Sequence, residues 1–138
     1  MASQSRPNPY SENCDVIRET FDRLGDKWTL VVIVILSSGP QRFSALQTGV
    51  LGISQRMLTV TLRKLERDGI VRRTVFPEVP PRVEYELTEV GKTLIKPVTG
   101  LADWSIENQA VIASNQSTFD ANNGQRMAVA RAPRARVS

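Results

Sequence analysis

The chain has 138 residues, a net charge of +4 and a sequence pI near 9.7, and 41% of its residues are hydrophobic. This length suits one domain of about 100 to 150 residues, and the composition is that of a soluble globular protein. The chain contains no histidine, which excludes Ser/His/Asp and Cys/His catalysis as well as imidazole metal ligands. Its one cysteine, Cys14, excludes an intrachain disulfide and a multi-thiolate zinc site, so we expect neither a metal nor a cofactor.

The N-terminus lacks the basic start and apolar stretch of a signal peptide. The longest unbroken apolar run, Leu30 to Leu36, has seven residues, whereas a membrane-spanning helix needs about 20. We therefore expect a cytoplasmic protein without a membrane partner.

The positive charge is unevenly distributed along the chain. Between Arg42 and Arg82, eight basic residues stand against three acidic ones, a net of +5, whereas Glu12 to Asp26 carries a net of −3. Residues 114–138 add a net of +3. A basic segment in a nearly neutral body indicates nucleic acid or another anionic partner.

The first predicted elements are two helices. Apolar residues recur at helical spacing over 16–24, and Gly25 ends this helix. Asp26 is the expected N-cap of the second helix, in which residues 28–36 are apolar on nearly all sides. The β-branched residues would also suit a central strand, but the cap and the Ser-Ser-Gly-Pro stop at 37–40 favour a buried central helix.

The next two helices form a helix-turn-helix pattern. A short helix is predicted over 45–50, with the Phe-Ser pair at 43–44 as its hydrophobic staple and cap. After a turn at 52–53, Ser54 caps a stronger helix whose leucines lie on one face and which Gly69 closes. Two consecutive helices joined by a tight glycine-containing turn are typical of a helix-turn-helix.

A predicted β-hairpin follows at once, with strands over 71–76 and 83–87. Three prolines within 77–82 lack the N–H that a ladder requires, so this segment is expected to be a stiff hairpin tip. The expected register pairs Phe76 with Val83. A helix-turn-helix followed by a hairpin indicates a winged helix.

The remaining segments lie at the two ends of the chain. Thr88 is expected to cap a last long helix with one apolar stripe and a kink near Pro97. Residues 114–138 are too poor in apolar residues to form a packing face and are expected to be a flexible basic tail. Residues 1–13 are an N-terminal arm and residues 14–113 the folded domain. The expected fold class is mainly α with a small β-hairpin, a winged helix-turn-helix with extra N- and C-terminal helices.

With its leucines buried, the Ser54 helix is expected to present a polar and basic face to solvent. Arginine can bond O6 and N7 of guanine, glutamine can pair with adenine, and an apolar side chain can meet the thymine methyl. We therefore expect this helix to read bases in the major groove, the alternative being a merely solvated helix face. The predicted DNA-contacting residues are Ser54, Gln55, Arg56, Thr59, Val60, Arg63 and, from the hairpin, Arg82.

The arginines of the hairpin each allow two interpretations. Arg82 lies at the hairpin tip, where prolines hold it outward, and is a candidate for contact with a phosphate or the minor groove. Its alternative role is an ion pair with Glu78 or Glu84. The expected register places Arg73 opposite Glu86, so cross-strand pairing accounts for Arg73.

Several motifs occur in an order that is typical of one family. They are Cys14-Asp15-Val16-Ile17, LGDKWTL at 24–30, GPQRFSAL at 39–46, GISQRMLT at 52–59, LRKLERDGIVRR at 62–73 and PEVPPRVEYELTEVGK at 77–92. Together, from Cys14 to Trp104, the sequence resembles the HxlR-type bacterial transcriptional regulators. It departs from the family pattern at Leu51 and Asp15, where proline is common.

The resemblance implies a bacterial, nucleoid-associated homodimer that binds a palindromic double-stranded DNA operator. It further implies that the first and last helices are dimerisation helices, and we expect the protein to act as a repressor. The residues expected at the dimer interface are Val16, Ile17, Leu94, Val98, Leu101 and Trp104.

The resemblance also draws attention to Cys14. In some similar proteins an equivalent cysteine senses electrophiles or oxidants through a disulfide or direct alkylation, so Cys14 is a candidate redox sensor and an electrophile or other small molecule a candidate effector. Arg18, one helical turn on, and the helix N-terminus favour the thiolate, whereas three neighbouring acidic residues oppose it. The alternative is a small buried hydrophobe at the start of a helix.

Two other classes of function compete with DNA binding. A winged helix can serve as a protein-protein interaction module whose same face meets an acidic partner; a sequence preference on DNA in addition to a salt dependence separates the two. An enzyme has little support, because no pair of catalytic carboxylates stands out and no glycine-rich phosphate loop is present.

Overall fold

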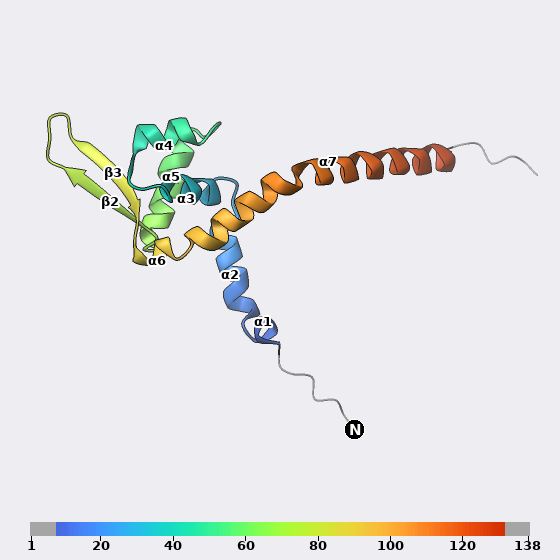
Figure 1. Ribbon diagram of the computed structural model, residues 1–138, viewed down its shortest axis with the longest axis horizontal. Coiled ribbons are helices and arrows are strands. Elements are labelled where there is room, and N and C mark those ends of the chain that lie inside the picture. The colour runs from blue at the N-terminus through green and yellow to red at the C-terminus, as the bar shows by residue number, and fades with distance from the viewer. Residues whose placement is uncertain (1–7, 132–138) are drawn as a thin grey trace, which may run out of the picture. The chain divides into compact units, whose positions relative to one another are not determined.

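The computed structural model describes residues 8–131, and side chains as far as residue 126. The chain divides into two compact units at Thr99 and Gly100. Within the described residues, no helix is both long and apolar enough to cross a membrane. The elements, all but β1 labelled in Figure 1, are α1 (Pro9–Glu12), α2 (Cys14–Leu24), α3 (Thr29–Leu36), β1 (Gln41–Arg42), α4 (Phe43–Gly49), α5 (Gln55–Arg67), β2 (Val71–Phe76), β3 (Arg82–Leu87), α6 (Glu89–Lys92) and α7 (Ile95–Arg131).

The central helix is α3, which confirms the prediction of a helix over a strand. Val32 and Ile33 are completely buried in it, and Leu36 is 2% exposed. The predicted N-cap Asp26 is wrong, because Trp28 is the N-cap of α3; Asp26 lies two residues earlier, where its Oδ1 accepts hydrogen bonds from the backbone N–H groups of Trp28 (2.9 Å) and Thr29 (2.8 Å). The regular helix begins at Thr29, after a turn that Asp26 organises.

The helix-turn-helix is formed by α4 and α5. The predicted Ser44 cap of the first helix is wrong, because Arg42 is the N-cap and Phe43 the first helical residue. Arg42 belongs to the short strand β1, which the sequence did not predict. Ser54 caps α5 as expected, accepting a hydrogen bond from the Met57 N–H at 3.1 Å, and the turn before it places Gly52 at a φ of +86°.

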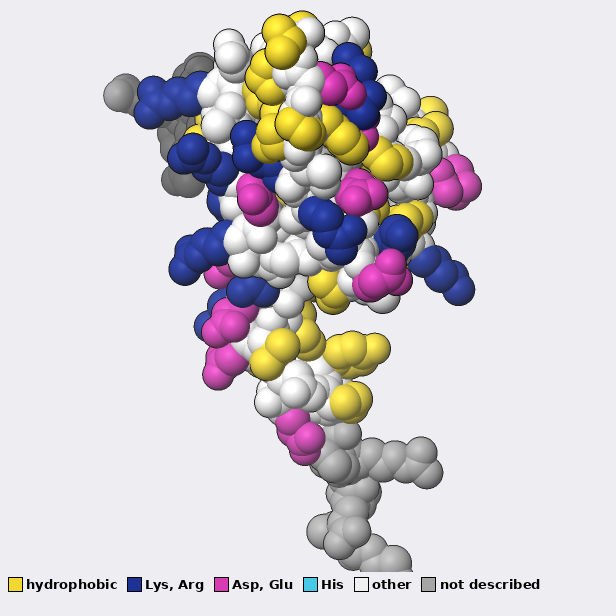
Figure 2. Space-filling model, turned by 90° about the vertical axis from the view of Figure 1, so that its left-hand side faces the viewer, with side chains coloured by type: hydrophobic (Ala, Val, Ile, Leu, Met, Phe, Trp, Pro, Cys, Tyr) yellow, Lys and Arg dark blue, Asp and Glu magenta, His cyan; other side chains and the backbone are white. Residues whose placement is uncertain are grey.

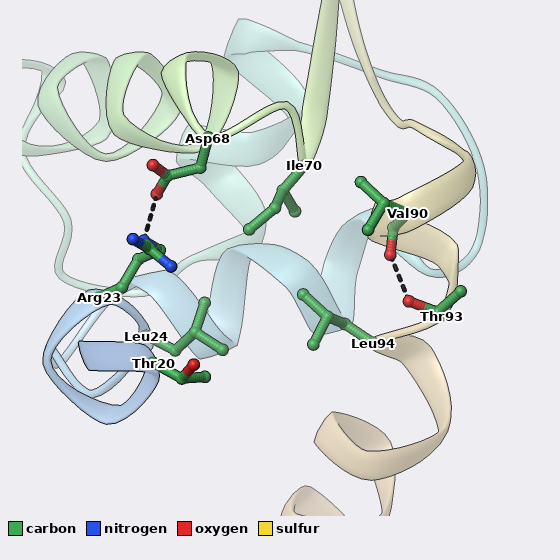
Figure 3. Close-up of a pocket in the computed structure, with 8 residues that line it drawn as sticks. All are labelled: Thr20, Arg23, Leu24, Asp68, Ile70, Val90, Thr93 and Leu94. Atoms are coloured by element: carbon green, nitrogen blue, oxygen red, sulfur yellow. Dashed lines mark hydrogen bonds and ion pairs between the residues drawn. The ribbon is translucent and has the colours of Figure 1, made fainter. Parts of the chain in front are cut away.

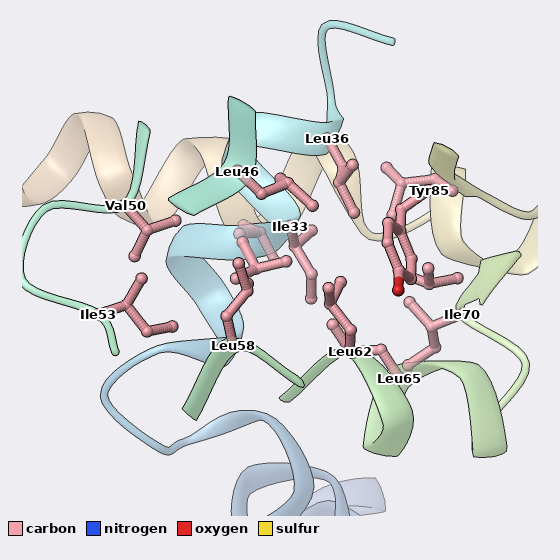
Figure 4. Packing of buried hydrophobic residues seen from close by; sticks show 14 residues of the cluster. Ile33, Leu36, Leu46, Val50, Ile53, Leu58, Leu62, Leu65, Ile70 and Tyr85 are labelled. Atoms are coloured by element: carbon pink, nitrogen blue, oxygen red, sulfur yellow. The ribbon is translucent and has the colours of Figure 1, made fainter. Parts of the chain in front are cut away.

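The hydrophobic core lies between these helices and the sheet. Leu58, Leu62 and Leu65 of α5 are at most 1% exposed, and Figure 4 shows them facing Ile33 of α3 and Tyr85 of β3. Burying a leucine side chain contributes about 1.5 to 3 kcal/mol relative to leaving it exposed. The leucine face of α5 therefore fixes which residues of that helix point outward.

The three-stranded antiparallel sheet has the order β1-β3-β2. The predicted strands are confirmed, but the predicted register is wrong by one residue, since Phe76 lies opposite Arg82 rather than Val83. β3 begins at Arg82, and in this register its guanidinium lies 4.1 Å from the centre of the Phe76 ring, a cation–π contact that favours the observed pairing. A shift of one residue changes the cross-strand partner of every side chain in the hairpin.

The C-terminal helix differs from its prediction at both ends. Thr88 caps α6 as expected, but the chain breaks at Thr93 and Leu94 before α7 starts. Pro97 explains the break, because it has no N–H for the Thr93 carbonyl and its ring clashes with that carbonyl in a continuous helix. In the first turn of α7, where no N–H partner is needed, proline is tolerated.

The predicted flexible tail is wrong as secondary structure over residues 114–131, which continue α7 as a helix. All side chains from Gln109 to Arg126 are exposed, in agreement with the absence of a packing face. Between Pro97 and Pro133 the sequence has no proline to stop a helix. The rest of the expected tail, 132–138, and positions 1–7 of the expected arm lie outside the described residues; within that arm, Asn8 caps the single turn α1.

Candidate nucleic-acid interface

The outward face of α5 carries the residues predicted to contact DNA. The predicted residues from Ser54 to Arg63 are all exposed, Val60 at 45%. Met57, 41% exposed, also lies on the accessible side and was missed, because its apolar side chain resembles a core residue. The set brought together on this helix is Ser54, Gln55, Arg56, Thr59, Val60 and Arg63.

The polar side chains on this face differ in whether their hydrogen-bonding groups are already used within the protein. The Ser54 hydroxyl oxygen accepts from Met57, and the Thr59 hydroxyl donates to the Gln55 carbonyl at 2.9 Å. Both hydroxyls therefore already form hydrogen bonds with the backbone of their own helix. Among the described residues, neither Arg56 nor Arg63 has an ion-pair partner, so both guanidiniums keep their donors available.

Two ion pairs link the C-terminal half of α5 to the N-terminal part of the chain. Arg23 Nε lies 3.2 Å from Asp68 Oδ2, at the rim of a pocket of about 340 Å³ between α2, α5 and α6 (Figure 3). Lys64 Nζ lies 3.1 Å from Asp26 Oδ2. Partial burial disfavours the ionised Asp26, but hydrogen bonds from Thr29, Trp28 and Lys64 outweigh it and lower its pKa from 3.8 to about 2.

In the hairpin, Arg82 forms both ion pairs that the sequence allowed. Its guanidinium lies 3.4 Å from Glu78 and 3.6 Å from Glu84, and the side chain is 29% exposed. It also covers the Phe76 ring. These contacts are those of the alternative interpretation, in which Arg82 braces the hairpin tip.

The corrected register reassigns the two arginines of β2. Arg72, not Arg73, lies opposite Glu86 and pairs with it at 3.1 Å. Arg73 lies opposite Tyr85, and among the described residues no acidic group pairs with it.

Figure 2, which views the side of the molecule on the left in Figure 1, shows basic, acidic and apolar side chains interspersed rather than one continuous basic patch.

Cys14 is the first residue of α2 and is exposed, which disfavours its interpretation as a buried hydrophobe. Arg18 lies one turn on, as expected, with its Nη2 3.5 Å from the Cys14 sulfur. Within the described residues, no group of histidine, cysteine or carboxylate side chains could hold a metal ion.

The residues expected at a dimer interface are of three kinds. Val16, Leu101 and Trp104 are more than half exposed, at 61%, 51% and 52%. Ile17 and Leu94 are half-buried. Val98 is only 6% exposed and belongs to the hydrophobic core of its own chain.

Comparison with known proteins identifies the family. The family model for HxlR-like helix-turn-helix proteins matches residues 23–112. The uncharacterized HTH-type transcriptional regulator YybR of Bacillus subtilis is 40% identical over 117 residues, which cover 85% of this chain and 93% of that protein.

Solved structures of two regulators are similar to this chain in both sequence and fold. The redox regulator HypR in its reduced form is 41% identical with a TM-score of 0.68, covering 72% of this chain and 98% of HypR. The reduced transcriptional regulator YodB of B. subtilis is 37% identical with a TM-score of 0.60, covering 67% of this chain and 90% of YodB. The chain thus has the expected winged-helix fold, and it belongs to the HxlR-like helix-turn-helix family of transcriptional regulators.

Proposed function

We propose that the protein is a sequence-specific repressor that binds a palindromic operator as a homodimer and places α5 in the major groove. The observation that carries this proposal is the outward face of α5, where Arg56 and Arg63 have no ion-pair partner among the described residues. A bidentate contact of Arg56 with guanine would discriminate against a wrong base by about 1 to 3 kcal/mol. Gln55, the first residue of the helix, would pair with adenine.

Dimerisation is supported by exposed apolar side chains on the terminal helices. Val16 of α2 and Leu101 and Trp104 of α7 are costly to leave in water, and a second copy would cover them. Two copies related by a two-fold axis would present their α5 helices to successive major grooves about 34 Å apart. The operator is then a palindrome with half-sites one helical turn apart.

The dimer is tested by light scattering after size-exclusion chromatography. Leu101→Glu should dissociate the dimer, because it would bury an unpaired charge in an apolar interface. Ile106→Glu is the matched control, since Ile106 is 73% exposed and lies on another side of α7. A Leu101→Glu protein that stays dimeric contradicts this interface.

Repression follows from occupancy, since a dimer seated on an operator that overlaps a promoter blocks polymerase without further contacts. We further propose that oxidation of Cys14 controls this occupancy, which the exposed thiol and the similarity to the redox regulator HypR support. Two Cys14 thiols from the two protomers lose two protons and two electrons to an oxidant such as diamide, which is reduced to the hydrazine, and one disulfide forms. Cys14→Ser should then abolish diamide-induced release from DNA; a retained response contradicts the thiol mechanism.

The experiment that tests the proposed function is selection of a bound duplex from random DNA, followed by affinity measurement across a salt series. We expect an enriched palindrome and an affinity well above that for random duplex at each salt concentration. A salt-dependent affinity equal for both duplexes contradicts sequence-specific binding and favours a protein-interaction module.

A further inference from the structure

A cleft of about 390 Å³ lies between α5 and the face of the β2-β3 hairpin. Thr59, Arg63 and Glu66 of α5 form one wall, Arg73 of β2 forms the other, and Leu62 and Tyr85 complete the lining. Leu62 and Tyr85 are core residues, at 1% and 9% exposure. Two arginines from different elements are therefore held at the mouth of one cleft by a rigid base.

The charge of this cleft depends on the hairpin register. Because Arg72 takes the position opposite Glu86 and pairs with it, Arg73 has no acidic partner across the strand. Among the described residues that line the cleft, Glu66 is the only carboxylate, against two guanidiniums. The cleft thus carries one net positive charge, with guanidinium donors that suit a phosphate oxygen.

We propose that Arg63 and Arg73 together hold a DNA backbone phosphate in this cleft, which makes Arg73 a DNA-contacting residue outside the recognition helix. The proposal rests on the proposed DNA-binding function. When α5 occupies a major groove and the hairpin approaches the neighbouring minor groove, the phosphate strand between the grooves passes over the space between the two elements. A contact there fixes how deeply α5 enters the groove without reading sequence itself.

Arg73→Ala and Arg72→Ala form a matched pair for the test. Each removes one positive charge from adjacent positions of the same exposed strand, and both are measured by fluorescence anisotropy on a random 30-base-pair duplex and on the selected operator. Arg73→Ala should weaken binding to both duplexes about tenfold and flatten the salt slope by about 0.9, the value for one neutralised phosphate. Arg72→Ala should change affinity less than about twofold, because its guanidinium is held by Glu86.

Two further variants test whether the DNA affinity changes in the direction that the charge of the cleft predicts. Arg73→Lys should recover most of the affinity that Arg73→Ala removes, because lysine also binds phosphate. Glu66→Gln should strengthen binding to both duplexes by removing a negative charge from the cleft. Thermal unfolding of each variant confirms that it is folded before binding is compared.

The proposed phosphate site is contradicted if Arg72→Ala and Arg73→Ala weaken binding equally. It is also contradicted if Arg73→Ala leaves the salt slope unchanged. These outcomes are separate from failure of the proposed function, which shows as a wild-type protein without preference for the operator. The phosphate contact is measured on the random duplex as well, so it is tested even in that case.

Discussion

Helix α5 and the β2-β3 hairpin are both rich in arginine, but they use it differently. In the hairpin, Arg72 pairs with Glu86 and Arg82 lies between Glu78 and Glu84, and of its three arginines Arg73 alone has no acidic partner among the described residues. On α5, Arg56 and Arg63 have no such partner among the described residues. A count of basic residues over Arg42 to Arg82 therefore overstates the charge that a ligand meets, because ion pairs neutralise part of it locally.

The exposure of the arginines on α5 depends first on the buried leucine face of this helix, which determines which of its residues point outward. Leu58→Ala should lower the free energy of unfolding by about 2 to 5 kcal/mol, because it removes a fully buried side chain and leaves a cavity. Chemical denaturation measures this loss. Val60→Ala on the exposed face is the control and should change stability by less than about 0.5 kcal/mol. Comparable losses in the two variants would mean that α5 is not oriented as described.

The N-cap of α5 is expected to make the next largest contribution to the free energy of unfolding. Ser54→Ala should cost about 1 kcal/mol of stability, since the Met57 N–H loses its capping acceptor. Ser54→Asn, which retains an acceptor, should restore most of it in the same denaturation assay. An alanine variant as stable as wild type would show that the cap does not hold the helix start that carries Gln55 and Arg56.

The smallest stability effect concerns Asp26, whose carboxylate accepts hydrogen bonds from Thr29 and Trp28 and pairs with Lys64. Because the pKa of Asp26 is lowered to about 2, ionised Asp26 stabilises the fold above about pH 4, and this contribution is lost as pH falls from about 4 to 2. Its side chain is 36% exposed, so solvent screening keeps the effect below about 1 kcal/mol. Asp26→Asn should unfold with a flatter pH dependence in that window. An identical acid transition in wild type and Asp26→Asn would contradict this role.

Patterns that are local in sequence predicted most of the fold. The leucine spacing of α5, the Ser54 cap and the prolines of the hairpin tip each act within a few residues, and all three were confirmed. The outward face of α5 follows directly from the helical period, so the exposure of the residues proposed to contact DNA could be predicted as a set. Asp26 was predicted as the N-cap of α3; it accepts hydrogen bonds from the N–H groups of Trp28 and Thr29, but the N-cap itself is Trp28.

Features that depend on distant contacts could not be predicted in the same way. Strand β1 exists only because β3 lies beside it, and the hairpin register depends on Arg82 stacking on Phe76. That one-residue shift turned Arg73 from an ion-pair partner of Glu86 into a cleft residue. The helical extension beyond residue 113 was missed because an exposed polar helix has no apolar stripe to reveal it.

Helix α5 is proposed to contact DNA through unpaired arginines, whereas the hairpin-tip arginine, Arg82, is held by ion pairs within the hairpin. The most direct test is the operator affinity of Arg56→Ala and Arg82→Ala, measured side by side at one salt concentration. We expect Arg56→Ala to lose about 1 to 3 kcal/mol of binding free energy and to relax the preference at one base pair, whereas Arg82→Ala keeps wild-type preference and nearly wild-type affinity. A larger loss in Arg82→Ala than in Arg56→Ala would contradict it.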